Sequence, residues 1–388
     1  MNILIAPDSF KGSLSAAEFC HIVADQIHCS RADVNIHLMP LADGGEGSIE
    51  AILANTPGKT ISTSVHNPLG QTVDAVYAIL DNQTAVIEMA QASGLPMLAP
   101  HERNPMLASS YGTGELIIAG LDQGCRRFII GLGGSATNDA GMGMLQALGV
   151  KFLNAGQQAI KACGQALKDI ESIDLSGIDP RIQGSEFIIA GDVTNPLCGE
   201  QGATYTYGPQ KGADSQMLAE LEAGIKHFAE KTGTLPAVDR SLANAAGAGA
   251  AGGMGYALMA YCQANMKSGF ELIAEMADLD GVFADVETRP DLIITGEGRF
   301  DSQSIQGKLV GRLSEYADKY NIPMLVICGS IGEDLDMNAI SQNISTFSIC
   351  HGPSSLEYTM NNTAVLLDKL ISNLLKVLFI DCQETRSF

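Results

Sequence analysis

The sequence has few basic residues. Its 388 residues include 23 lysines and arginines against 44 aspartates and glutamates, which gives a formal net charge of −21 at pH 7. Nucleic acids and anionic membrane surfaces are bound through basic surface, so this balance argues against both as partners. An anionic small ligand would have to be held by a few local cations against an unfavourable overall field.

Signals of export, membrane insertion and disulfide bonding are also missing. The nine cysteines form no CxxC pair and show no Cys/His ligand spacing, which favours reduced thiols. The N-terminus MNILIAPDSF lacks the basic start of a signal peptide, so we expect a cytoplasmic protein. The uncharged stretch 244–266 holds five glycines and lacks a flanking belt of lysines and arginines, so we do not expect it to span a membrane.

Several nucleotide and nucleophile motifs are absent or incomplete. No GxSxG elbow occurs, and the P-loop pattern fails because Ser302 stands where its first glycine belongs and Leu309 follows Lys308. A GxGxxA pattern starts at Gly131 without a later acid for a ribose, and a GxGxxG pattern starts at Gly247 without a preceding strand. An NAD(P)-dependent oxidoreductase of small hydroxy acids is therefore a weaker alternative.

What is present is the alternation of strands and helices that a parallel sheet requires. The apolar runs predict strands over 2–7, 35–40, 291–295, 323–329 and 345–350. The helical periodicity predicts helices over 14–27, 46–53, 310–319 and 363–379. Ser15 and Glu18 form a capping box for the first helix. These patterns predict an α/β, Rossmann-like, doubly wound parallel sheet.

The middle of the chain has a different sequence pattern. NPLG at 67–70 reads as a turn between two alternating runs, and glycine-rich stretches then interrupt helices of mixed length. We therefore predict a Rossmann-like domain made from both ends of the chain, residues 1–66 and 285–388. A second α/β domain, residues 67–284, is inserted between them. Such sheets bind ligands outside the carboxyl ends of their strands.

Polar residues follow several predicted strands. The first strand leads to Asp8, Ser9 and Lys11, and the second leads to Asp43. The strand at 291–295 leads to GEGRFDSQSIQGK, where Gly296 and Gly298 predict a turn. In the middle region, FIIGLGGSATND and FIIAGDVTNPL also pass from an apolar strand into polar loops, and GPQKG predicts a tight turn that presents a lysine.

Carboxylates beside glycine-lined anion sites suit magnesium-assisted phosphoryl transfer, in which positioning and charge neutralisation do most of the catalytic work. An anion-binding or regulatory protein without turnover would also need a cleft and cations. It would have less use for so many acids near the anion.

Eight motifs together resemble those of the bacterial type I glycerate kinases. In chain order they are APDSFKGSLSA, LADGGEGSIEA, YGTGELI, GLGGSATNDAGMGMLQALG, GDVTNPLCG, GPQKGA, AGAGAAGGMGYAL and TGEGRFDSQSIQGK. The resemblance implies transfer of the ATP γ-phosphoryl group to D-glycerate with Mg²⁺, the 2-phosphoglycerate being favoured. It implies small-molecule partners, with a homodimer left open. The sequence departs from the family pattern at Gly12, Tyr111, Ala140 and in GKLVGRL.

The candidate site residues fall into three groups. Those expected to act in catalysis are Asp192 as the base, Lys11 and Arg299. Those expected to bind substrate or nucleotide are Asp8, Ser9, Gly133, Gly134, Ser135, Asn138, Asn195, Lys211, Gly247, Gly249, Gly252 and Lys308. Those expected to hold the metal are Asp43, Glu297 and Asp301.

Overall fold

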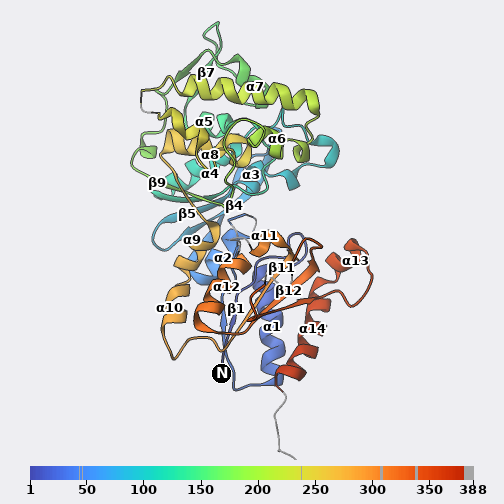
Figure 1. Cartoon of the computed structure of the whole chain (residues 1–388). Helices are drawn as coiled ribbons and strands as arrows, with labels where there is room; N and C mark the ends of the chain where they lie inside the picture. The colour runs from blue at the N-terminus through green and yellow to red at the C-terminus, as the bar shows by residue number, and fades with distance from the viewer. Residues whose placement is uncertain (43, 46, 237, 306–308, 337–339, 380–388) are drawn as a thin grey trace, which may run out of the picture. The chain divides into compact units, whose positions relative to one another are not determined.

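The structure is a computed structural model of the chain, and it describes residues 1–42, 44–45, 47–236, 238–305, 309–336 and 340–379 (Figure 1). The chain divides into two compact units. Unit 1 comprises residues 1–43, 50–56 and 270–388, and unit 2 comprises residues 44–49 and 57–269. The chain therefore passes from one unit to the other after residues 43, 49, 56 and 269.

Unit 1 is built on a five-stranded parallel sheet. Its strands, in spatial order, are β13 (Ile344–Ser348), β12 (Met324–Ile331), β11 (Leu292–Phe300), β1 (Asn2–Ile5) and β2 (Asn35–Leu38). Its helices are α1 (Ala16–Ser30), α9 (Gly269–Met276), α10 (Leu279–Ala284), α11 (Ser302–Ile305), α12 (Leu309–Tyr320), α13 (Leu356–Asn361) and α14 (Thr363–Leu378), and α2 (Ser48–Asn55) begins in residues 44–49. The predicted α/β class with a parallel sheet is confirmed.

The unit 1 core explains why these segments form strands and helices. Successive side chains of a strand point to opposite faces, so Ile3 and Ile5 of β1 share one face. They belong to a buried cluster with Phe19 and Val23 of α1 and Leu367 of α14. Helices α1 and α14 lie side by side over this cluster (Figure 1). The capping box predicted for α1 is also present.

The strand order fixes where unit 1 can bind a ligand. Numbered along the chain, the order is 2-1-3-4-5, so β1 has its successor β2 on one side and β11 on the other. Connections leave β1 and β11 toward opposite sides of the sheet at such a switch point, and a crevice opens outside the carboxyl ends of these two strands. Residues from Asp8 and from Glu297 onward occupy this edge.

One local prediction is wrong. GEGRF (296–300) does not turn away after the strand, because β11 continues to Phe300 and pairs with β12, with Glu297 opposite Cys328 and Arg299 opposite Ser330. The glycine at 296 serves close packing instead. A Cβ there would lie 2.7 Å from the Ile327 carbonyl oxygen and 2.7 Å from the ring of Phe19.

Unit 2 is built on a six-stranded mixed sheet. Its spatial order is β10 (Asn265–Lys267), β9 (Glu186–Ala190), β6 (Arg127–Gly131), β5 (Thr84–Glu88), β4 (Thr72–Leu80) and β3 (Gly58–His66). The first four strands are parallel, and β4 is antiparallel to both of its neighbours. A small sheet pairs β7 (Lys151–Leu153) with β8 (Ser172–Asp174). Its helices are α3 (Ala90–Ser93), α4 (Tyr111–Asp122), α5 (Met142–Ala147), α6 (Ala203–Tyr207), α7 (Ser215–Thr232) and α8 (Ala250–Cys262).

The unit boundaries differ from those expected from the sequence. Strand β3, which we assigned to the first part of the split domain, pairs with β4 in the unit 2 sheet. Residues 270–284, which we assigned to the insertion, belong to unit 1. Within the uncharged stretch 244–266, the α-helix covers only the residues of α8, Ala250–Cys262. None of the helices in the described part of the chain combines the length and apolar character that a membrane crossing needs.

Candidate active site

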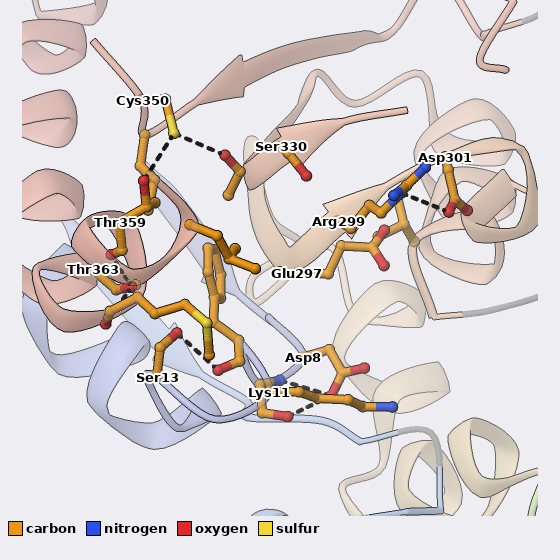
Figure 2. Close-up of a pocket in the computed structure, with 18 of the residues that line it drawn as sticks. Asp8, Lys11, Ser13, Glu297, Arg299, Asp301, Ser330, Cys350, Thr359 and Thr363 are labelled. Carbon is orange, nitrogen blue, oxygen red and sulfur yellow. Dashed lines mark hydrogen bonds and ion pairs between the residues drawn. The ribbon is translucent and has the colours of Figure 1, made fainter. Parts of the chain in front are cut away.

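A cavity of about 640 Å³ opens at the carboxyl ends of the unit 1 strands (Figure 2). The charged lining residues that the structure describes all follow or end β1 and β11, and they are Asp8, Lys11, Glu297, Arg299 and Asp301. Figure 2 shows them on one side of the view, with Ser13, Cys350, Thr359 and Thr363 on the other. Ser9 lines the same cavity, so the structure brings together six of the predicted site residues.

Asp8 is fixed at the point where β1 leaves the sheet. Its backbone N–H donates to the Gly296 carbonyl at 2.8 Å, and the Thr295 hydroxyl donates to the Ala6 carbonyl at 2.7 Å. The Asp8 carboxylate accepts from the Ser9 backbone N–H at 2.7 Å, and the residue is only 8% exposed. These bonds hold one carboxylate oxygen in place and leave the group at the cavity wall.

Lys11 sits on a closed turn. The backbones of Phe10 and Leu14 bond to each other in both directions, and the Ser13 hydroxyl donates to the Phe10 carbonyl at 3.0 Å. Gly12 has a φ of +75°, a conformation that side chains rarely tolerate. The turn thus presents an exposed lysine at a strand end of an acidic protein.

The second set of charges comes from β11 and the loop after it. Asp301 accepts from the Gln303 backbone N–H at 3.0 Å and pairs with Arg299 at 3.3 Å. The Arg299 side chain is 66% exposed, so this ion pair contributes little to stability and leaves the guanidinium available to a ligand. Burial, together with the nearby Glu297 carboxylate, raises the pKa of the Cys328 thiol to about 12.

Unit 2 has its own strand-end edge. Gly44 lies against it, since a Cβ on Gly44 would be 2.8 Å from the Ala190 carbonyl carbon at the end of β9. The Glu88 carboxylate at the end of β5 is 5% exposed and accepts from the Ile49 backbone N–H at 2.8 Å. Sequence reasoning missed Glu88, although an acid that ends the apolar run TAVIE is the same signal that drew attention to other strand ends.

Asp192 and Asn195 follow β9 but differ in surroundings. Asp192 is exposed. Asn195 is engaged within its own loop, where its amide donates to the Gln201 carbonyl at 2.7 Å and its side-chain oxygen accepts from the Tyr207 hydroxyl at 2.7 Å. This geometry favours a structural role for Asn195. Asp192 remains accessible, and its carboxylate could reach a ligand.

The glycine loop after β6 divides into an accessible and a buried part. Gly133 and Gly134 are accessible, and Gly134 has a φ of +70°. Ser135 is 8% exposed and bridges to Gly94. From there to Ala140 the loop is buried. Only the first turn of the loop can therefore offer backbone N–H groups to an anion.

Asn138 and Lys211 lie inside unit 2. The Asn138 amide donates to the Thr204 hydroxyl at 3.1 Å, and the Lys211 ammonium donates to the Thr137 carbonyl at 2.7 Å. Lys211 is 1% exposed, and its burial lowers its pKa to about 7, although nearby Asp139 acts in the opposite direction. This geometry favours a role for Lys211 in holding the buried end of the glycine loop.

Asp139, which was not among the predicted site residues, anchors the same loop. Its carboxylate accepts from the Ser110 backbone and hydroxyl at 2.8 Å each, and from the backbone N–H groups of Gly141 and Gly143. Burial nevertheless raises the pKa of this carboxyl. Asp139 thus joins the first turns of α4 and α5, where a negative charge is favoured.

The three glycines of the GxGxxG pattern are packing residues. Each is buried, and a Cβ on Gly247 would collide with Met266, on Gly249 with the Pro196 carbonyl, and on Gly252 with the Thr137 carbonyl. Their backbones are therefore covered by other parts of unit 2, and the pattern gives no support to a dinucleotide cofactor.

Two predicted residues, Asp43 and Lys308, lie outside the described residues. Within the described ranges, no group of three or more His, Cys, Asp or Glu side chains is placed to hold a metal ion by itself.

Comparison with known proteins identifies the family. The sequence model of the glycerate kinase family matches residues 3–379. The chain belongs to the glycerate kinase family. It is 42% identical over 372 residues to the glycerate kinase of Bacillus subtilis, covering 95% of both chains. It is 45% identical over 336 residues to the glycerate 2-kinase of Escherichia coli, covering 86% of this chain and 87% of the relative.

A solved structure shows the same fold. A crystal structure described as that of glycerate kinase 2 from Salmonella typhimurium LT2 superposes with a TM-score of 0.83 at 40% identity. The match covers 97% of this chain and 98% of that one.

Three departures from the family pattern can now be located. Gly12 lies in the Lys11 turn. Tyr111 begins α4, where its ring meets His66 edge-on at 5.8 Å. Ala140 has a φ of +52°, a left-handed conformation that glycine adopts more easily. None of the three is among the residues that line the unit 1 cavity.

Proposed function

We propose that this protein transfers the γ-phosphoryl group of ATP to D-glycerate, using Mg²⁺ and forming 2-phosphoglycerate. The observation that carries the proposal is the charged edge of the unit 1 sheet, where three carboxylates and two cations line one cavity at the switch point. The choice of D-glycerate as the acceptor is supported by two relatives, the glycerate kinase of Bacillus subtilis and the glycerate 2-kinase of Escherichia coli.

The cations would act on the phosphates. Lys11 and Arg299 both line the cavity in a protein with a net charge of −21, so a polyphosphate has few other partners there. Phosphoryl transfer needs positive charge on the oxygens of the transferring group, and hydrogen bonds to charged donors are about twice as strong as neutral ones. Both have a defined scaffold, since the Lys11 turn is closed by backbone bonds and Arg299 lies on the paired strand β11.

The carboxylates fit Mg²⁺. This ion prefers oxygen ligands and usually takes one or two protein carboxylates together with substrate phosphates and water. Asp8, Glu297 and Asp301 supply such oxygens, and Asp43 is a fourth candidate outside the described residues. When bound, Mg²⁺ would neutralise charge on the phosphates. The acids of the cavity are then compatible with an anionic substrate that they would otherwise repel.

Asp192 would accept the proton of the glycerate hydroxyl. An alcohol nucleophile needs a positioned carboxylate, and Asp192 is an exposed acid that follows a buried strand. Gly133 and Gly134, at the accessible start of the glycine loop, offer backbone N–H groups to the acceptor or its product. Transfer to the 2-hydroxyl is favoured because one relative is a glycerate 2-kinase.

The test is a coupled assay for ADP with ATP, Mg²⁺ and D-glycerate, followed by phosphorus NMR of the product. We expect turnover that requires all three components and a phosphorus signal from 2-phosphoglycerate. The Lys11→Met variant serves as a control that the activity belongs to this protein. Absence of turnover with D-glycerate and related hydroxy acids, together with saturable anion binding, would instead identify a binding protein.

A further inference from the structure

We propose that the uncharged end of the unit 1 cavity is an adenine subsite, which makes unit 1 the nucleotide-binding unit. The inference rests on the proposed function and deepens it. It concerns the part of the cavity that the charged residues leave unused, between the Lys11 turn, the end of β13 and helix α13.

The cavity has two chemically different ends. Among the described residues, its charged lining residues come from the ends of β1 and β11. The rest of its wall is apolar or carries hydroxyl and thiol groups, and its apolar members are Phe10, Leu309, Val310, Ile349, Leu356 and Met360. The volume of about 640 Å³ lies within the range of sites that enclose a cofactor-sized ligand.

The polar groups at the uncharged end are already engaged with one another. The Ser354 hydroxyl lies 3.0 Å from the Thr359 hydroxyl, and the Cys350 thiol donates to the Gly329 carbonyl at 3.2 Å. The Thr363 hydroxyl donates to the Thr359 carbonyl at 2.9 Å. A ligand part that enters here therefore meets a surface that favours an uncharged, flat group over a charged one.

Two residues of α13 offer apolar surface to such a group. Leu356 and Met360 are four positions apart, so they share one face of the helix, and both line the cavity. Leu356 is 75% exposed. Covering it with a heterocyclic ring would remove apolar surface from water.

One packed segment connects the two ends. A Cβ on Gly12 would lie 3.2 Å from the terminal methyl of Met360, so the Lys11 turn rests directly on α13. Lys11 and Met360 are therefore held a short distance apart. A ligand that satisfies both must carry anionic groups at one end and an uncharged ring at the other. ATP does, whereas D-glycerate is a small polar acid without an apolar part.

A larger cavity in unit 2, of about 930 Å³, is the competing location for the nucleotide. It is lined by Lys161 and Lys168 and by Leu107 and Tyr111. It has cations for phosphates, but fewer acids that would share a metal with them, since Asp169 is the one carboxylate among the described residues that line it.

The natural sequence contains no tryptophan, which allows a direct experiment. Three single-tryptophan variants are titrated with MgATP in the absence of an acceptor. Leu356→Trp reports on the proposed subsite, and Leu107→Trp, at a 51% exposed position, reports on the unit 2 cavity. Val377→Trp, at a 70% exposed position of α14 that does not line either cavity, is the control.

We expect a saturable change in emission from Leu356→Trp alone, because the adenine ring would lie against the indole. A response from Leu107→Trp alone, or no response from Leu356→Trp in an enzyme that turns over, would overturn the inference. Failure of the proposed function is distinguishable, since it removes turnover of the unmodified enzyme whether or not Leu356→Trp responds to MgATP.

Steady-state kinetics give a second test. Met360→Glu places a carboxylate in the apolar wall, so we expect the KM for ATP to rise by about tenfold or more while the KM for D-glycerate stays within about twofold. Met360→Leu conserves the apolar surface and is expected to keep both constants. An unchanged KM for ATP in folded Met360→Glu would refute the adenine assignment.

Discussion

The buried ammonium of Lys211 makes a prediction about stability and pH. The pKa of Lys211 falls from an ordinary 10.5 to about 7 on folding, chiefly through burial. The unfolded chain therefore binds more protons than the folded protein between these values, and the free energy of unfolding rises with pH across that window. At 1.36 kcal/mol per unit, the gain from about pH 7 to about pH 9 is about 2 kcal/mol.

Lys211→Met removes this titration while retaining most of the side-chain volume. We expect wild type to gain about 2 kcal/mol relative to the variant between about pH 7 and pH 9 in urea unfolding followed by circular dichroism. Buried thiols such as Cys262, whose pKa burial raises to about 12, lower stability above about pH 9, but they do so in both proteins.

The exposed lysine Lys151 provides the control, because Lys151→Met removes an amine that keeps its hydration on folding. Loss of the Thr137 hydrogen bond in Lys211→Met adds an offset that does not depend on pH in this range. Parallel stability profiles for wild type and Lys211→Met would show that the buried amine does not titrate in this window, and would refute a lowered pKa for Lys211.

Three further substitutions test the site and the scaffold. Lys11→Met should lower kcat/KM by about tenfold or more, because a charge-assisted contact to phosphate is worth about 1.5–3 kcal/mol; wild-type kinetics would assign Lys11 to solvent. Asp192→Asn should reduce turnover by about 10²–10⁴ at saturating Mg²⁺ with a nearly unchanged Tm; a lower Tm with normal turnover would make Asp192 a turn cap. Gln83→Gly, at an exposed turn with a φ of +60°, should stabilise the protein by about 0.5–1 kcal/mol in urea unfolding, and a loss of stability would contradict the strain expected there.

Features that depend on nearby residues were predictable from the sequence. The alternation of apolar runs located β1, β2, β11, β12 and β13 and helices α1, α2, α12 and α14, because burial on a sheet imposes a pattern within each segment. The capping box of Ser15 and Glu18 spans one helical turn, and it is present. The rule that ligands bind at strand ends then selected Asp8, Lys11 and Glu297, which line one cavity.

Features that depend on distant contacts were not predictable. Lys211 contacts a carbonyl 74 positions away, and nothing in GPQKG distinguishes a lysine that faces inward from one that faces a ligand. Glycines present a similar ambiguity. The sequence signal of Gly252 is the same whether its missing side chain makes room for a phosphate or for the Thr137 carbonyl. Gly296 also looked like a turn, because its neighbours Ile327 and Phe19 are remote in the chain.

The pairing of β1 with β11 also sets an order of events during synthesis. Ile3 pairs with Leu292, and all six strands of the unit 2 sheet lie between them in the chain. At about 5–20 residues per second, β1 leaves the ribosome roughly 15–60 seconds before its partner. A nascent chain that stops short of residue 292 holds every strand of unit 2. It still lacks β11, the strand that brings Glu297, Arg299 and Asp301 to the sheet edge where Asp8 and Lys11 lie.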